Sequence, residues 1–277
     1  ADGLAAGKGV VVAMTIEEAN AAVEDMLSGN RFGDAGSTVV IEEFMEGEEA
    51  SLLAFVDGKT VVPMIASQDH KRIFDGDEGP NTGGMGTYAP APVLTDALRD
   101  EAMKTILEPM VAAMQKEGMP YVGCLYAGLM ITPQGPKVVE FNARFGDPET
   151  QVVLPLLDSD LGQIMMACAT GTLTADMVKW KDSSAACVIL ASKGYPETSS
   201  KGDMIHGDIK QHDTTIVFHS GTKLIGDEYV TNGGRVLGIV GLGKDLRTAL
   251  DRAYGRIEHI DFEGMQYRTD IGAKAFK

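Results

Sequence analysis

Three residues in the middle of the chain place a carboxylate, an amide and a guanidinium two positions apart. They are Glu140, Asn142 and Arg144, in the stretch VVEFNARFGDPETQ. On a β-strand, residues two apart face the same side. Glu140 and Asn142 both offer oxygen, which Mg²⁺ prefers, and Arg144 can grip a phosphoryl oxygen in a planar fork. Because such groups are costly to bury unpaired, the row indicates a metal and phosphate site rather than core.

A second polar stretch, QDHKRIFDGDEGPNTGGMGTYAP, runs from residue 68 to residue 90. Lys71 and Arg72 give it local positive charge. The backbone N–H groups of the segment Asn81, Thr82, Gly83, Gly84, Met85 and Gly86 could form a concavity for an anion. The alternative is an ordinary surface loop, but loops of this length inside a compact domain are usually functional. We therefore interpret residues 67–92 as a long functional loop.

The chain opens with a glycine-rich stretch, ADGLAAGKGV. It is not a P-loop, because Gly3 and Gly7 are one residue too close and Lys8 is followed by Gly9 instead of Ser or Thr. The β-branched residues that follow predict a strand over 10–13. The stretch could still be a hairpin that lies over phosphates, binding them through N–H groups and one ammonium. The alternative is a small-residue turn with a surface lysine.

An acidic stretch carries five glutamates in the eight residues 42–49, after a predicted strand over 38–44. A solvated acidic turn is one interpretation. The other is a linker between two lobes, in which backbone groups contact an adenine edge and a following carboxylate holds ribose hydroxyls.

Periodicity and turn signals predict the elements that position these residues. A capping box at Thr15 and Glu18 starts a helix, which Gly29 ends. Pro109 predicts a kink in a helix over 96–117. The other predicted elements are a hairpin of 50–56 with 60–66, strands 123–131, 137–142, 185–192, 215–219 and 235–240, and helices 161–169 and 245–257. The sequence texture changes near residue 182, where we expect a domain boundary.

Composition narrows the class of protein. The 277 residues carry a net charge of −16, which disfavours a nucleic-acid or anionic-membrane surface. The three cysteines, Cys124, Cys168 and Cys187, are far apart in apolar surroundings, as expected of buried thiols in a reducing compartment. No apolar run approaches the roughly 18 residues of a membrane span. We expect a cytoplasmic protein and, because the glycine loop has a strand on one side only, a piece of a longer chain.

The four stretches together resemble glycinamide ribonucleotide synthetases, the phosphoribosylamine–glycine ligases of purine biosynthesis. The resemblance rests on GLAAGKGV, EEF-x-x-GEE-x-S, HKR…GPNTGGMGTYAP and VEFNARFGDPETQ, and continues through SKGYP, NGGRVLGIVG and YRTDIG. It implies an α/β (α+β) ATP-grasp fold. The implied domains are a partial small lobe over 1–48, a large lobe over 49–182, and a small, mainly antiparallel β domain over 183–277.

The resemblance also implies roles for particular residues. Gly7, Lys8 and Gly9 would lie over the ATP phosphates, Glu42, Glu43, Phe44 and Met45 would line the adenine, and Glu49 would bind ribose. Glu140 and Asn142 would ligate Mg²⁺ or Mn²⁺. Arg144, Lys71 and Arg72 would act on the transferred phosphoryl group, and the Asn81–Gly86 segment would face the acyl substrate.

The implied reaction joins glycine to 5-phosphoribosylamine through glycyl phosphate, and gives glycinamide ribonucleotide, ADP and phosphate. We expect small-molecule partners only, and a monomer. Two departures stand out: the family's N-terminal domain and a lysine before Ala1 are absent, and the strand Tyr126–Met130 lacks a second metal carboxylate. Alternatives are an ATP-grasp ligase for another carboxylate and amine, an ATP-binding fragment without turnover, or a structural fragment.

Overall fold

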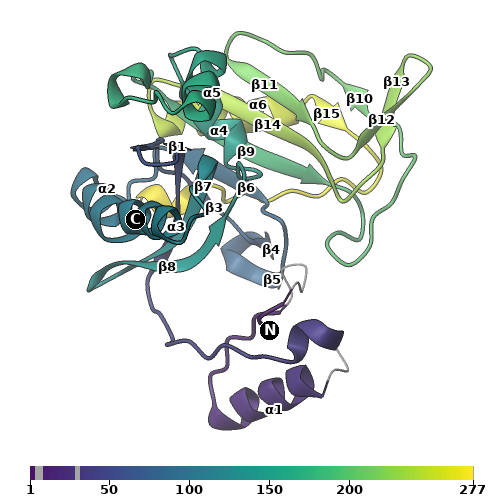
Figure 1. Cartoon of the computed structure of the whole chain (residues 1–277). Coiled ribbons are helices and arrows are strands. Elements are labelled where there is room, and N and C mark those ends of the chain that lie inside the picture. Colours follow the sequence, from purple (N-terminus) through teal and green to yellow (C-terminus); the bar gives the residue numbers. More distant parts are fainter. Residues whose placement is uncertain (4–8, 29–31, 277) are drawn as a thin grey trace. The chain divides into compact units, whose positions relative to one another are not determined.

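A computed structural model describes residues 1–3, 9–28 and 32–276. It separates into two compact units, Ala1–Glu46 and Gly47–Lys277 (Figure 1). Every strand ladder in the described part of the chain is antiparallel. With the helices, this gives the α+β class expected from the sequence. No helix among the described residues is long and apolar enough to cross a bilayer.

The smaller unit contains helix α1 (Ile16–Leu27) and the 3₁₀ turn η1 (Gly33–Gly36). The predicted cap is confirmed: Thr15 Oγ1 accepts a hydrogen bond from the Glu18 N–H at 3.2 Å. The Glu18 carboxylate accepts from the N–H of Met14 at 2.8 Å, one residue earlier than a capping box predicts. Gly29, the predicted end of this helix, lies outside the described residues.

The two strands predicted in the smaller unit, over 10–13 and 38–44, are wrong for this structure. A strand exists through ladder hydrogen bonds to a neighbour, and within the described residues neither segment has a ladder partner. Val10 is 80% exposed and Ile41 is 83% exposed, so their apolar side chains are not packed either. β-branched sequence favours extended backbone, but it does not supply the neighbouring strand.

The first sheet of the larger unit has the order β2-β1-β7-β8. Its strands are β1 (Glu48–Asp57), β2 (Val61–Pro63), β7 (Val122–Thr132) and β8 (Gly135–Asn142). The hairpin predicted around Asp57-Gly58 is confirmed, with Gly58 at φ +99°, a conformation that glycine adopts readily. Strand β8 lies at an edge of this sheet and carries two of the three residues of the predicted metal and phosphate row.

The stretch predicted as one long loop, residues 67–92, contains four short strands instead. They are β3 (Gln68–Asp69), β4 (Arg72–Phe74), β5 (Glu78–Asn81) and β6 (Gly86–Ala89), with the 3₁₀ turn η2 (Asp75–Asp77) between β4 and β5. β6 pairs with β3 on one side and, on the other, with a strand about 100 residues later in the sequence. These segments of two to four residues become strands because each has a ladder partner: β3 pairs with β6, β4 pairs with β5, and β6 also pairs with the distant strand.

The second sheet has the order β11-β14-β9-β6-β3, with β9 (Ser184–Ala191), β11 (Thr215–His219) and β14 (Arg235–Gly243). It thus joins strands from both sides of the boundary expected near residue 182, and the division into three domains stays a prediction. Three two-stranded sheets complete the strands. They are β4 with β5, β10 (His206–Gly207) with β15 (Ile260–Asp261), and β12 (Thr222–Ile225) with β13 (Glu228–Thr231).

The helix predicted over 96–117 forms as α2 (Asp96–Ala102), a π-helical turn (Met103–Leu107) and α3 (Glu108–Lys116). The irregular turn ends two residues before Pro109, which has no N–H to donate to the preceding turn. The remaining helices are α4 (Thr150–Val153), α5 (Leu161–Thr170) and α6 (Leu246–Ile257), with 3₁₀ turns η4 (Leu154–Leu156), η5 (Ala175–Met177) and η6 (Ala273–Phe276). The predicted α5 and α6 are confirmed.

Alternation along two central strands builds a layered core. On β9, Cys187 and Ile189 face a cluster shared with α4, α5 and the first sheet, whereas Val188 and Leu190 face α6. Leu53 and Phe55 of β1 join the shared cluster, and alternate β1 residues pack on the α2–α3 side. All three cysteines are buried, unpaired thiols. The shared cluster fixes the two sheets together and so positions the polar loops at their ends.

Candidate active site

The row predicted on β8 forms a chain of hydrogen bonds. The Asn142 side-chain amide donates to Glu140 Oε1 at 3.1 Å, and Arg144 Nη2 donates to Asn142 Oδ1 at 3.4 Å. Arg144 Nη1 also donates to the carbonyl of Phe145 at 2.9 Å. Glu140 and Arg144 are exposed and Asn142 is half-buried. The three side chains therefore share one accessible face, as their spacing predicts.

The donor set of this row suits a hard cation with few protein ligands. A carboxylate and an amide oxygen are of the right chemistry for Mg²⁺, which commonly keeps waters and substrate phosphates in its shell. The residue opposite Glu140 on β7 is Gly128, where a Cβ would lie 3.3 Å from Glu140 Cγ. In the described part of the chain, no group of three or more His, Cys, Asp or Glu side chains has a metal-binding arrangement. A metal here would have two protein ligands, Glu140 and Asn142.

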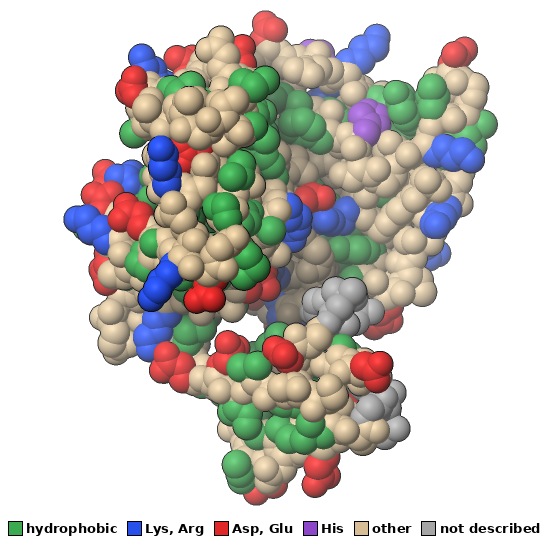
Figure 2. Space-filling model, viewed as in Figure 1, with side chains coloured by type: hydrophobic (Ala, Val, Ile, Leu, Met, Phe, Trp, Pro, Cys, Tyr) green, Lys and Arg blue, Asp and Glu red, His purple; other side chains and the backbone are tan. Residues whose placement is uncertain are grey.

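Lys71 lies among the acidic side chains of this region. Its Nζ is 2.5 Å from Glu49 Oε2, and the two side chains are 39% and 46% exposed. Burial alone would lower the pKa of Lys71, but attraction to Glu49, Asp69 and Glu140 outweighs burial and raises the pKa above its ordinary value. Lys71 is therefore a firmly charged ammonium close to the β8 row. Basic and acidic side chains also meet in a recess near the middle of the larger unit in Figure 2.

Asp69 interacts with Lys71 on one hand and with Glu149 on the other, and sequence reasoning selected neither acidic residue. Burial and the charge of Glu149 raise the pKa of Asp69 well above its ordinary value, against the opposing effects of the His70 N–H, Lys71 and Arg235. Glu149 is buried at 3% exposure and accepts hydrogen bonds from Tyr126 Oη at 3.0 Å and Ser51 Oγ at 3.3 Å. Asp69 is therefore a carboxyl group that can hold a proton near Lys71.

The backbone N–H groups of residues 82–85 are already hydrogen-bonded inside the protein. Thr82 donates to the Lys71 carbonyl, Gly83 to Tyr195 Oη, Gly84 to Thr82 Oγ1 and Met85 to the His70 carbonyl, at 2.7–2.9 Å. In this structure they do not form the anion-binding concavity that the sequence suggested.

The cation at this loop is one that sequence reasoning missed. The Arg235 guanidinium donates to the Gly83 carbonyl at 2.7 Å and to the Asp147 carbonyl and carboxylate at 2.9 and 3.1 Å.

The structure does not bring every predicted residue to the row. Arg72 Nη1 donates to the Gly79 carbonyl at 2.6 Å, within the β4–β5 hairpin. Successive residues of extended backbone point to opposite sides, so the Arg72 side chain points away from that of Lys71. Gly7 and Lys8 lie outside the described residues. Gly9 and Glu42–Met45 belong to the smaller unit, where Gly9 is buried and Phe44 is 58% exposed. Their roles toward a nucleotide stay predictions.

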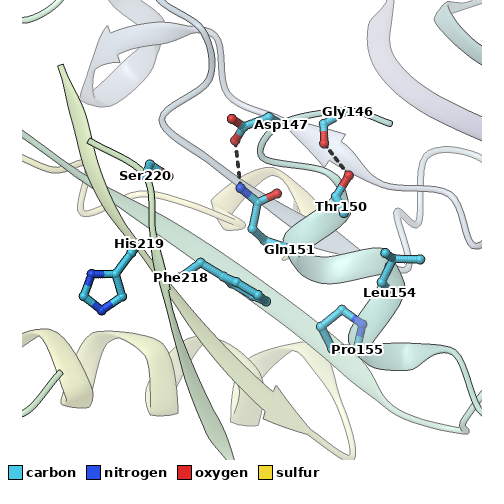
Figure 3. A pocket seen from close by; sticks show the side chains of 9 residues that line it. All are labelled: Gly146, Asp147, Thr150, Gln151, Leu154, Pro155, Phe218, His219 and Ser220. Carbon is cyan, nitrogen blue, oxygen red and sulfur yellow. Dashed lines mark hydrogen bonds between the residues drawn. The ribbon is translucent and has the colours of Figure 1, made fainter. Parts of the chain in front are cut away.

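A cavity of about 770 Å³ begins at the loop that follows Arg144 (Figure 3). It is lined by Gly146, Asp147, Thr150, Gln151, Leu154, Pro155, Phe218, His219 and Ser220. Gln151 Nε2 donates to Asp147 Oδ1 at 2.7 Å, so the carboxylate is held between Gln151 and Arg235. The cavity therefore has a fixed acidic edge and an apolar wall of Leu154, Pro155 and Phe218.

Asp147, Glu149, Tyr195 and Arg235 lie in motifs that carry the family resemblance, and Asp69 lies in the polar stretch over 68–90. What the sequence did not show is that these side chains meet. They come from segments up to about 165 residues apart, and no local periodicity reports on a long-range contact. A search for polar residues inside GDPETQ, SKGYP and NGGR would have selected four of the five.

Comparison with known proteins identifies the family. Residues 1–150 match the family model of the phosphoribosylglycinamide synthetase ATP-grasp (A) domain, and residues 185–274 match that of its C domain. The chain belongs to the phosphoribosylglycinamide synthetase family. Among curated members of that family, the phosphoribosylamine–glycine ligase of Caulobacter vibrioides is 57% identical over all of this chain and 65% of its own length. The chain thus spans about two thirds of the length of the relatives it matches.

Other relatives extend this comparison. The Gallus gallus trifunctional purine biosynthetic protein adenosine-3 is 53% identical over 99% of this chain, which covers 28% of that protein. A crystal structure of the Thermotoga maritima phosphoribosylamine–glycine ligase superposes with a TM-score of 0.83 at 34% identity, covering 98% of this chain and 68% of that one. A biotin carboxylase domain from Hydrogenobacter thermophilus gives a TM-score of 0.69 at 14% identity, covering 94% and 56% of the two chains, which shows a shared fold.

Proposed function

We propose that this chain carries the ATP-binding and phosphoryl-transfer part of a phosphoribosylamine–glycine ligase. The observation that supports this best is the accessible row of Glu140, Asn142 and Arg144 beside the Lys71 ammonium. It combines oxygen ligands for a cation with two positive groups for phosphate oxygens. The high identity to proteins named for this activity supports the choice of reaction.

In the proposed reaction, an oxygen of the glycine carboxylate attacks the γ-phosphorus of ATP, and the bond to the ADP oxygen breaks. The amine of 5-phosphoribosylamine then attacks the carbonyl carbon of glycyl phosphate, phosphate leaves, and the amine loses a proton. Little covalent chemistry by the protein is required, since positioning and charge stabilisation supply most of the rate. Arg144 and Lys71 would hold the oxygens of the phosphoryl group as it moves.

Glu140 and Asn142 are the residues proposed to hold Mg²⁺ or Mn²⁺. When bound, the metal would neutralise negative charge on the nucleotide phosphates. In the structure the Asn142 amide nitrogen faces Glu140. A half-turn of the amide would place Oδ1 on that side, and it would exchange the 3.4 Å hydrogen bond from Arg144 Nη2 for the contact with the metal.

The remaining contacts to ATP are proposed from the family resemblance. Gly7, Lys8 and Gly9 would cover the phosphates, and the Glu42–Met45 backbone would contact adenine. Glu49 would bind ribose hydroxyls, and it would then exchange its contact with Lys71 for one with the nucleotide. Because the N–H groups of 82–85 are occupied, we assign the Asn81–Gly86 segment the role of a wall for the acyl substrate. Arg72 is the weakest of the proposed catalytic groups, since it contacts its own hairpin.

The proposed setting is a cytoplasmic enzyme of purine synthesis that acts as a monomer on small molecules. The acidic net charge of −16 supports a partner set without nucleic acid.

The test is ADP release by this chain with Mg²⁺, ATP, glycine and freshly generated 5-phosphoribosylamine, with each omitted in turn. We expect release that needs both glycine and the amine. Release that another carboxylate and amine support equally well would indicate a different ligase, and nucleotide binding without release would indicate an ATP-binding module.

A further inference from the structure

Arg268 is a charged side chain of the larger unit that is only 1% exposed. Its guanidinium forms a two-pronged contact with Asp270, with Nε–Oδ1 and Nη2–Oδ2 both at 2.7 Å. Nη1 donates to Asp77 Oδ1 at 2.9 Å and to the Arg72 carbonyl at 3.1 Å. One buried cation near the end of the chain is thus attached to a hairpin almost 200 residues earlier.

Residues that follow Arg268 in the sequence also contact this earlier part of the chain. The Thr269 N–H donates to Asp75 Oδ1 at 2.8 Å, and the Thr269 hydroxyl donates to the other Asp75 oxygen. Asp270 Oδ2 accepts from the Gly76 N–H at 2.9 Å. Lys274 Nζ is 2.6 Å from Asp77 Oδ2, and the Gly272 N–H donates to His70 Nε2 at 3.4 Å. We call residues 268–274 the C-terminal brace.

The contacts of the brace fall on both sides of Lys71. His70 is held on one side, and Arg72, Asp75, Gly76 and Asp77 are held on the other. The Lys71 carbonyl is fixed in addition by the N–H and hydroxyl of Thr82. The backbone that carries the ammonium is therefore clamped from a segment that does not itself reach Glu49 or Glu140 in the structure.

The β4–β5 hairpin needs such support. A two-stranded hairpin is marginally stable on its own, and all four residues of β5 are exposed. Its apolar anchor is Ile73, which packs with Met85, Ala191 and Tyr195 in a small cluster. Polar contacts from the brace supply the order that this small cluster does not.

We propose that the C-terminal brace, through Arg268, is a positioning element that holds Lys71 against Glu49 and the β8 row. Its value for catalysis rests on the proposed function, whereas its effect on Lys71 does not. The C-terminal part of the chain is thereby made a part of the phosphate site without contributing a group that touches the substrate. Loss of the brace leaves Lys71 in the molecule but lets its ammonium leave the acidic cluster.

The test measures how fast the Lys71 amine is acetylated by N-hydroxysulfosuccinimide acetate at one pH, read by mass spectrometry relative to exposed Lys59. In Arg268→Met we expect labelling of Lys71 to rise roughly threefold, equivalent to about 0.65 kcal/mol. Arg268→Lys should restore part of the protection, because an ammonium cannot reproduce the fork.

Arg256→Met is the matched control, because the Arg256 side chain is only 9% exposed and is paired with Asp208 and the Lys210 carbonyl, and none of its recorded contacts falls on residues 70–77. It should leave the ratio unchanged. Asp75→Ala is the second variant, since Asp75 is exposed and its loss spares the buried cation. It should raise Lys71 labelling in the same direction by a smaller factor.

Wild-type labelling in folded Arg268→Met, or equal increases in Arg268→Met and Arg256→Met, would overturn the proposal. If Arg268→Met does not fold, unchanged labelling in Asp75→Ala overturns it and increased labelling supports it. ADP release is assayed separately with the wild-type chain. Increased labelling of the variants, together with no release by wild type, would retain the brace and reject the ligase assignment.

Discussion

Two charged regions of the larger unit, the β8 row and the C-terminal brace, use the same kinds of side chain in opposite ways. In the row, Glu140 and Arg144 are exposed, and each is held by one or two hydrogen bonds. In the brace, Arg268 is buried and all of its nitrogens have partners. The buried guanidinium is fully paired, whereas the exposed charges of the row keep part of their hydrogen-bonding capacity open.

The difference follows from the energetics of burial. A charge removed from water must regain its hydration energy from neighbours, so a buried ion pair tolerates no missing partner. An exposed charge is solvated by water and can exchange that water for a ligand at low cost. Removing a charge of the brace should therefore lower the free energy of unfolding more than removing a charge of the row. Removing a charge of the row should instead have the larger effect on activity.

The largest effect on stability is expected from Arg268→Met. Removing the guanidinium takes the two-pronged partner from Asp270 and leaves Asp77 with Lys274 as its cation. Breaking a buried pair costs about 3–5 kcal/mol, and because both carboxylates are partly exposed we expect the lower end, about 3 kcal/mol. Chemical denaturation measures this change in the free energy of unfolding. Arg99→Met, which removes a surface cation paired with Asp96 and Asp100, should cost less than about 1 kcal/mol. Equal costs for the two variants would show that burial does not distinguish the regions.

Glu140→Ala should lower activity strongly and stability very little. We expect ADP release to fall at least about a hundredfold, because a ligand for the metal is lost at the phosphates. The free energy of unfolding should change by less than about 0.5 kcal/mol, as for other exposed positions. Glu117→Ala, at the end of α3, is the control for an exposed glutamate. Turnover close to wild type in Glu140→Ala would reject the site.

The protonation of His70 should make the stability of the buried region depend on pH. Burial, with the charges of Arg268 and Lys274, lowers its pKa from 6.5 to about 4. Between those values the unfolded chain binds the proton and the folded chain does not, so the free energy of unfolding falls as pH decreases from about 6.5 to 4. The His70 contribution approaches about 3 kcal/mol.

Denaturation of wild type and His70→Gln at several pH values checks this expectation. The stability difference between the two proteins should change with pH by that amount, whereas a constant difference between pH 7 and pH 4 would contradict it.

The smallest effect on stability is expected from Glu49→Gln. Its contact with Lys71 is close but more than a third exposed on both sides, so removal should cost less than about 1 kcal/mol. Nucleotide binding is the more sensitive measurement, since Glu49 is proposed to hold ribose. Weaker Mg²⁺–ATP binding with a nearly unchanged free energy of unfolding would show that Glu49 behaves like the residues of the row. A decrease of several kcal/mol in the free energy of unfolding would show that it behaves like the residues of the brace.

Much of the fold could be predicted from the sequence. The α1 cap, the hairpin at Asp57-Gly58, strands β7 and β8 and helices α5 and α6 carry local signals that their surroundings reinforce. Among the described residues, the segments 10–13 and 38–44 have no ladder partner, whereas segments within 67–92 pair with each other and, through β6, with distant β9. Whether an extended segment becomes a strand depends on a neighbour that the local sequence does not name.

The site divides in the same way. The spacing of Glu140, Asn142 and Arg144 determined that they share one face, because the side-chain period of a strand is a local property. The sequence by itself also determined the family to which its motifs belong. Only the tertiary structure decided that Lys71 joins this row while Arg72 turns away, and that Arg235 occupies the loop at Gly83. The C-terminal brace likewise depends on contacts between residues almost 200 positions apart, which packing and burial select and no sequence period encodes.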